Sequence, residues 1–118
     1  MPLQCIALKE GSICGEAHDG YTVFKGVPYA APPIGALRFL PPQPVQPWAG
    51  VYEANHFTAA CPQLPQMPGS FYEKEFYSTP ERWPHLDEDC LYLNIWTPAT
   101  SSQANLPVAL WIHGGAFD

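Results

Sequence analysis

The residues best suited to chemistry lie at the end of the chain, where an apolar run leads into two glycines. Residues 108–113 read Val-Ala-Leu-Trp-Ile-His, and Gly114, Gly115 and Ala116 follow them. Small residues at the end of a strand let a substrate approach the backbone N–H groups closely. Such donors stabilise the oxyanion of a tetrahedral acyl-transfer intermediate by ~3 to 4 kcal/mol each. A simple Gly-Gly turn is the alternative interpretation, because glycine pairs are common at turns.

Two apolar segments in the second half of the chain must position this turn. Residues 108–113 form the nearly continuous apolar run of a strand that is buried on both faces of a sheet. Residues 91–97 alternate instead, with Leu91, Leu93 and Ile95 on one face. A strand buried on both faces needs covering layers, and the sequence contains no long amphipathic helix to supply them. The pattern therefore predicts part of a larger fold.

The N-terminal third predicts a small antiparallel meander. Its β-prone pieces are residues 4–8, 11–16 and 21–27. The last two are separated by Asp19-Gly20, a strong hairpin dipeptide.

Proline and glycine dominate the middle of the chain. The spacing of proline over residues 28–47 is too dense for a helix or a central strand and predicts an extended loop. One short helix is expected after Ser70, which can cap it, with Glu73 at the reciprocal capping-box position.

Composition narrows the range of partners. The net charge is −6, and the five basic residues are scattered singly, which argues against nucleic acid as a partner. No apolar run is long enough to span a membrane. The N-terminus lacks the basic start, apolar stretch and cleavage site of a secretory signal, which favours a cytoplasmic protein over a secreted one.

A second motif gives the glycine turn its context. The stretch Glu-Asp-Cys-Leu at residues 88–91 resembles the signature of the type-B carboxylesterases, the cholinesterase-like branch of the α/β-hydrolases. Further matches occur in the family's order at residues 24–30, 33–39 and 47–48. The chain thus resembles the N-terminal portion of such an enzyme over essentially its whole length.

The resemblance implies a fold class and a domain assignment. Residues 1–118 would form part of an α/β-hydrolase domain: a small antiparallel meander, long proline-rich and cysteine-bounded loops, and the first strands of the central sheet. The chain is apparently truncated, because it lacks the nucleophile elbow and the rest of the catalytic triad.

The resemblance also assigns roles to individual residues. Gly115 and Ala116 match residues whose N–H groups form the oxyanion hole, and Gly114 shapes the turn. Arg38 and Glu88 match a structural salt bridge. Cys61 and Cys90 match a disulfide of the family that closes a long loop beside the active site.

The other two cysteines have no counterpart in this pattern. Cys5 and Cys14 are expected to be buried free thiols. No cofactor is implied for the family.

The implied reaction is serine acyl transfer on a small-molecule ester. None of the serines in this chain stands in a Gly-x-Ser-x-Gly elbow, so the 118-residue chain by itself is expected to be inactive. One alternative is a catalytically inactive cholinesterase-like binding or adhesion fragment. Another is a ligand for an SH3-type module, because residues 38–44 spell an Arg-x-x-Pro-x-x-Pro-like peptide. A third is a zinc site, whose candidate ligands are His56, Cys61, His85 and Cys90.

Overall fold

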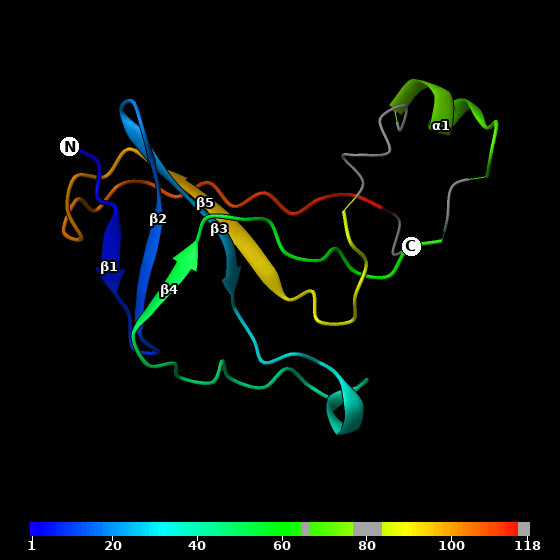
Figure 1. The fold of residues 1–118 in the computed structure, drawn as a ribbon, viewed down its shortest axis with the longest axis horizontal. Helices are drawn as coiled ribbons and strands as arrows, with labels where there is room; N and C mark the ends of the chain where they lie inside the picture. The colour runs from blue at the N-terminus through cyan, green and yellow to red at the C-terminus, as the bar shows by residue number, and fades with distance from the viewer. Residues whose placement is uncertain (65–66, 77–83, 116–118) are drawn as a thin grey trace.

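Three strands at the N-terminus form the antiparallel meander that the sequence predicts (Figure 1). The computed structural model describes residues 1–64, 67–76 and 84–115. β1 (Cys5–Ala7) pairs with β2 (Ser12–His18), and β2 pairs in turn with β3 (Tyr21–Pro28). The chain turns between β2 and β3 at Asp19 and Gly20, where glycine accommodates a φ of +82°. The hairpin dipeptide was therefore a correct signal.

β2 joins two parts of a five-stranded sheet whose main order is β1-β2-β3-β5. Its first half pairs with β1 and, in parallel, with β4 (Val51–Ala54), whereas its last three residues pair with β3. Gly15 lies where these pairings change, and a Cβ there would be 2.5 Å from the backbone oxygen of Val23. β4 is absent from the sequence prediction, because four residues after a proline-rich loop give too short a pattern to recognise.

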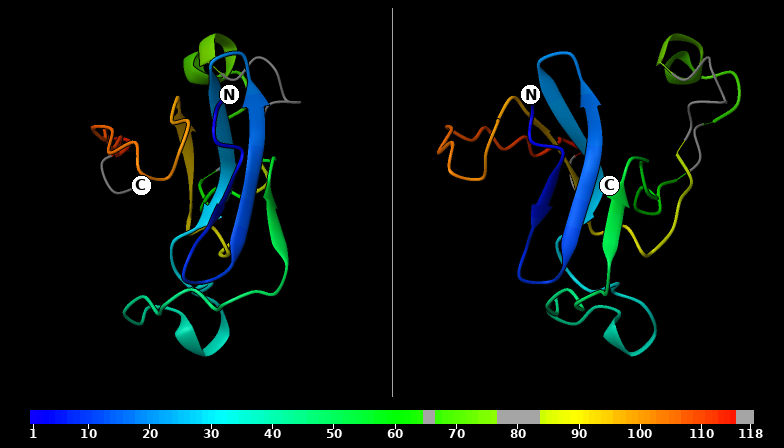
Figure 2. Two further views of the ribbon diagram at one scale, coloured as in Figure 1. Left: turned by 90° about the vertical axis from the view of Figure 1, so that its left-hand side faces the viewer. Right: turned by 60° about the vertical axis from the view of Figure 1, so that its left-hand side comes forward.

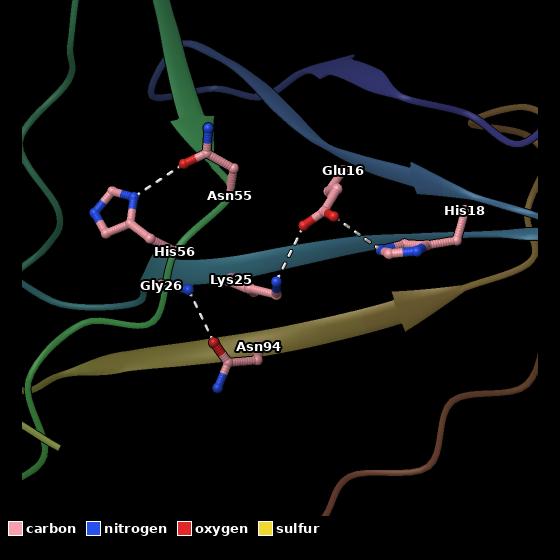
Figure 3. Close-up of polar contacts among 7 residues, drawn as sticks. All are labelled: Glu16, His18, Lys25, Gly26, Asn55, His56 and Asn94. Carbon is pink, nitrogen blue, oxygen red and sulfur yellow. Dashed lines mark hydrogen bonds and ion pairs between the residues drawn. The ribbon is translucent and has the colours of Figure 1, made fainter. Parts of the chain in front are cut away.

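β5 (Tyr92–Thr97) corresponds to the predicted strand 91–97 and pairs antiparallel with β3. The register shifts between Phe24 and Val27, where β3 contains an irregularity of the bulge type. Gly26 lies there with φ +69°, and its N–H donates a 2.9 Å hydrogen bond to Oδ1 of Asn94 on β5 (Figure 3). The hydroxyl of Tyr52 on β4 donates to the Gly26 carbonyl at 2.7 Å. Three strands are thus tied together at one glycine.

The predicted short helix is present as α1 (Phe71–Phe76). The Glu73 N–H donates to Oγ of Ser70 at 3.1 Å, and the Glu73 carboxylate accepts from the N–H of Gly69. This is the capping box shifted by one residue on its return contact. Figures 1 and 2 show α1 away from the sheet, and within the described ranges it packs against none of the strands. The predicted proline-rich loop contains only the single 3₁₀ turn η1 (Gly35–Leu37).

A small core lies where β2, β3 and β4 meet. Its fully buried members are Ile13, Phe24, Val27 and Ala54. Ile6, Trp48, Tyr52 and Leu93 pack around them and are partly exposed. Since Trp48 comes from a loop and Leu93 from β5, the core combines side chains of all five strands with one from a loop.

Residues 108–113 do not form the strand that the sequence predicts. The chain after β5 passes along one side of the sheet (orange to red in Figure 2) without strand structure. Val108 is 91% exposed and Trp111 87% exposed, and the neighbouring apolar side chains are open as well. A strand needs backbone partners on an adjacent strand, and none of the described residues provides them here. The expectation that this segment lacks its covering layers is consistent with this exposure.

Candidate functional site

The glycine turn ends the described part of the chain. A Cβ built on Gly114 would meet no atom within 4 Å, and Gly115 has a φ of +150°, which disfavours other residues. Neither backbone N–H donates to another described residue. Nδ1 of His113 lies 2.7 Å from the Gly114 carbonyl oxygen, so its neutral tautomer with the proton on Nδ1 donates there. Ala116, the second expected oxyanion donor, lies outside the described residues.

Three acidic residues, two in the signature and one just before it, each have a different partner. Asp87, just before it, accepts a 2.9 Å hydrogen bond from the N–H of Asp89, and this bond holds the pKa of Asp87 below its usual value. Glu88 binds Arg38, with 2.7 Å between Oε1 and Nη2. Partial burial, followed by a hydrogen bond with Asp89, raises the pKa of Tyr92 to about 12. The signature therefore ties its own loop together and joins it to β5.

The Arg38–Glu88 ion pair links the proline-rich loop to the signature loop. Both side chains are about half exposed, at 51% and 44%. An exposed pair of this kind contributes only ~0 to 1 kcal/mol, so it guides the loop more than it stabilises the fold. The Arg38 guanidinium also lies 5.4 Å from the ring centre of Phe39. Arg38 is therefore already engaged within the chain, which weakens the interpretation of residues 38–44 as an SH3-type ligand.

Cys61 and Cys90, which the resemblance pairs, are free thiols in the structure. They lie at the base of the loop between them, where the Ala60 N–H donates to the His85 carbonyl at 2.8 Å. Burial raises the pKa of the Cys90 thiol, and the proximity of Cys61 raises it further. Because the thiolate is the reactive form, the raised pKa lowers the reactivity of the Cys90 thiol near neutral pH. Their disulfide is not formed here and stays a prediction for oxidising conditions.

Cys5 and Cys14, by contrast, form a disulfide between β1 and β2. The expectation of buried free thiols was wrong for both residues. Their strands face each other with Cys5 directly opposite Cys14, which brings the two Cα atoms to 4.1 Å. The register follows from a two-residue turn at Lys9 and Glu10, whereas the sequence alone suggested a break at Glu10-Gly11, which does not place Cys5 opposite Cys14.

The zinc alternative finds no support in the arrangement of its candidate ligands. Within the ranges that the structure describes, no three His, Cys, Asp or Glu side chains gather where a metal ion could be held. His56 hydrogen-bonds to Asn55 instead, at 3.0 Å (Figure 3), and His85 lies 3.6 Å from Asp87. Nor is any described helix long and apolar enough to cross a membrane.

Comparison with known proteins identifies the family. The family model described as the carboxylesterase family matches residues 3–118. The chain belongs to the carboxylesterase family. It is 38% identical over 117 residues to the para-nitrobenzyl esterase of Bacillus subtilis (strain 168), covering 99% of this chain and 22% of that protein. It is 43% identical over 116 residues to carboxylesterase 1E of Mus musculus, covering 92% of this chain and 20% of the relative.

Solved carboxylesterase structures show the same relationship. A structure of PNB esterase superposes with a TM-score of 0.77 at 39% identity, covering 97% of this chain and 22% of that one. A carboxylesterase of Geobacillus stearothermophilus gives a TM-score of 0.71 at 40% identity, over 98% of this chain and 20% of that one. The chain therefore has the fold of the N-terminal part of an α/β-hydrolase. It spans about a fifth of the length of these carboxylesterases.

Proposed function

We propose that this segment supplies the oxyanion-hole turn of a carboxylic-ester hydrolase that acts by serine acyl transfer. Membership of the carboxylesterase family carries the proposal. It is supported by the open surroundings of Gly114 and by a backbone at Gly115 that other residues adopt with strain. The N–H groups of Gly115 and Ala116 are the proposed donors, and Gly114 leaves room for the substrate carbonyl.

The proposed chemistry divides between this segment and the rest of the protein. A serine attacks the ester carbonyl, a histidine accepts its proton, and an acidic residue orients that histidine. These groups follow the oxyanion turn in the chain order of α/β-hydrolases, and the residue after the serine gives a third N–H donor. The present segment would stabilise the oxygen that becomes negative as the tetrahedral intermediate forms, at ~3 to 4 kcal/mol per donor. Alone, it is expected to hydrolyse no ester.

The surrounding loops would hold the turn in place. Arg38 and Glu88 connect the proline-rich loop to the signature loop, and Cys61 and Cys90 lie at the base of the loop they bound. In this proposal, oxidation would convert that base into a covalent closure, whereas the backbone hydrogen bonds of Ala60 close it in the reduced state.

The first experiment compares the 118-residue chain with the product of the whole reading frame that contains it. Both would be assayed with a short-chain p-nitrophenyl ester and with a p-nitrobenzyl ester, the class named for the Bacillus relative. We expect hydrolysis by the longer product and none by the 118-residue chain. A longer product that folds, lacks the serine of a Gly-x-Ser-x-Gly elbow and leaves both esters intact would favour the inactive adhesion alternative.

The oxyanion role itself can be tested by removing one N–H group. Replacing Ala116 by its α-hydroxy acid in the active protein exchanges that N–H for an ester oxygen and leaves the side chain unchanged. Loss of one donor should lower kcat about 100- to 1000-fold with a small effect on KM. The same replacement at Ala104, whose N–H donates to the Ser101 carbonyl at 3.3 Å in a loop, is the matched control. Equal losses at both positions would contradict the role.

A further inference from the structure

The Cys5–Cys14 disulfide lies on the open side of the β1–β2 pair. Ile6 and Ile13 are the next pair in the register, and both pack toward the core. Since successive side chains in a strand point to opposite faces, the two sulfurs lie on the other face. Cys5 is exposed and Cys14 half-buried, so a reagent in solution reaches the bond from the Cys5 side.

Few other interactions hold β1 in place. β1 has three residues, and among the described elements it packs only against β2. Beyond the pairing of the strands, the backbone bonds near it are Leu3 N–H to the Ala99 carbonyl at 2.7 Å, Leu8 N–H to the Gly11 carbonyl at 2.9 Å and Gly15 N–H to the Gln4 carbonyl at 2.9 Å. A three-residue strand with this little contact depends strongly on a covalent link.

β1 also covers an apolar cavity of about 320 Å³ on the core side of the sheet. Leu3, Ile6 and Leu8 contribute its outer wall. Phe24 and Ile95 of the sheet, among others, line the inner wall. This cavity is already partly open to solvent; if β1 separates from β2 it widens, while most of the core, which comes from β2, β3 and β4, remains covered.

We propose that the Cys5–Cys14 disulfide is a redox-sensitive staple that a small dithiol reduces, releasing β1 and widening the apolar cavity. One thiolate of the dithiol attacks Sγ of Cys5, the Cys5–Cys14 bond breaks, and Cys14 leaves as a thiolate that takes up a proton. The second thiolate of the dithiol then attacks the other dithiol sulfur, which is bound to Cys5 in the mixed disulfide. Cys5 leaves as a thiolate that takes up a proton. One disulfide is reduced and one is formed, with two electrons passing from the dithiol to the protein.

Glu53 gives this site a preference among reductants. It stands opposite Cys14 in the parallel β2–β4 register and is exposed, so its carboxylate faces an incoming reagent from the neighbouring strand. The glutathione thiolate also carries two carboxylates and one ammonium group, so Glu53 repels it more strongly than the singly charged thiolate of dithiothreitol. The staple should therefore open faster with dithiothreitol than with glutathione at equal thiolate concentration.

Amide hydrogen exchange with and without dithiothreitol tests the proposal. The full chain would carry Cys61→Ser and Cys90→Ser, so that the β1–β2 disulfide is the only one possible. Reduction should speed exchange at Ile6 and at Leu8, whose N–H donates to the Gly11 carbonyl, about 100-fold, the factor that corresponds to closing a loop of this size. Exchange at Ile95 in β5 should change little. A further variant with Cys5→Ser and Cys14→Ser should exchange at the fast rate with or without reductant.

A second measurement does not depend on how well the chain is folded. Trypsin cleaves after Lys9, in the turn between the two cysteines. With the staple closed, the peptide of residues 1–9 stays attached and is released only after reduction, as mass spectrometry would show. The proposal is overturned if that peptide is released without reductant, if exchange at β1 is unchanged by reduction, or if β5 loses protection together with β1.

Discussion

β3 and residues 108–113 are both rich in apolar, β-prone side chains, but they lie in opposite environments. β3 contributes Val23, Phe24 and Val27 to the interior, whereas Val108 and Trp111 are almost fully exposed. β3 lies between β2 and β5 and pairs with both, while no described strand pairs with residues 108–113. An apolar, β-prone sequence thus becomes a strand only where its backbone N–H and C=O groups find partners. Both segments have the composition of a strand, but only β3 has neighbouring strands to which its backbone can hydrogen-bond.

The comparison has a consequence for the proposed chemistry. The sheet is held by its own core, but the glycine turn follows the segment that the described residues support least. In the solved carboxylesterases the matched region is about a fifth of the chain. We therefore expect the strands that pair with residues 108–113 to come from the other four fifths of such a protein. Substitutions in the two regions should therefore differ in how much they lower the free energy of unfolding.

The largest difference is expected for truncated aromatic side chains. Phe24→Ala removes a buried ring and should lower the free energy of unfolding by ~3 to 5 kcal/mol. Trp111→Ala removes a larger ring that is 87% exposed and should change it by less than ~0.5 kcal/mol. Urea unfolding followed by circular dichroism measures both without relying on tryptophan fluorescence. Similar losses in the two variants would mean that residues 108–113 are packed in solution.

A matched pair of glycines gives the next largest effect. In Gly15→Ala the new Cβ would lie 2.5 Å from the Val23 carbonyl oxygen, which is backbone and cannot move without disturbing β3. We expect a loss of ~1 to 3 kcal/mol in the free energy of unfolding. In Gly114→Ala the Cβ meets nothing within 4 Å, and stability should stay within ~0.5 kcal/mol. A small loss of unfolding free energy in Gly15→Ala would show that β2 and β3 are farther apart in solution than in this structure.

Alkaline pH should weaken the contact between the signature loop and β5. Burial and Asp89 raise the pKa of Tyr92 to about 12, above the ~10 of an unfolded tyrosine. The folded state therefore holds its proton more tightly, and the resulting stability is complete below about pH 10 and lost as the pH rises toward 12. Tyr92→Phe should flatten this part of the stability profile, whereas Tyr29→Phe, at an exposed position, should not. Identical profiles for the two variants would exclude the raised pKa of Tyr92.

Several of these features could be predicted from the sequence, and the exceptions share a cause. The β2–β3 hairpin, β5 and the capped α1 follow from signals within a few neighbouring residues: Asp19-Gly20, alternation over 91–97, and Ser70 with Glu73. β4 and the state of residues 108–113 depend on partners far along the chain, which local patterns do not contain. The Cys5–Cys14 bond lies between these cases, because it required combining a turn length with a strand register.

The glycine turn was located by residue type together with the Glu-Asp-Cys-Leu stretch. Its oxyanion role remains a prediction. The geometry that would test it includes Ala116, outside the described residues, and groups from the rest of the protein. The contribution of Asp89 to Tyr92 was not expected, since the sequence marks Asp89 as part of a motif without indicating which side chain it meets.

The smallest effect is expected for the exposed ion pair between two loops. Arg38→Gln removes the partner of Glu88 and should lower the free energy of unfolding by ~1 kcal/mol or less, because both side chains remain in contact with water. The difference from the unsubstituted chain should vanish in ~1 M salt, where charges are screened beyond about 3 Å. Lys9→Gln removes an exposed cation that has no ion pair among the described residues and serves as the control. A loss well above 1 kcal/mol that survives high salt would mean that Arg38 becomes buried, as it would if the rest of the hydrolase fold closed over the proline-rich loop.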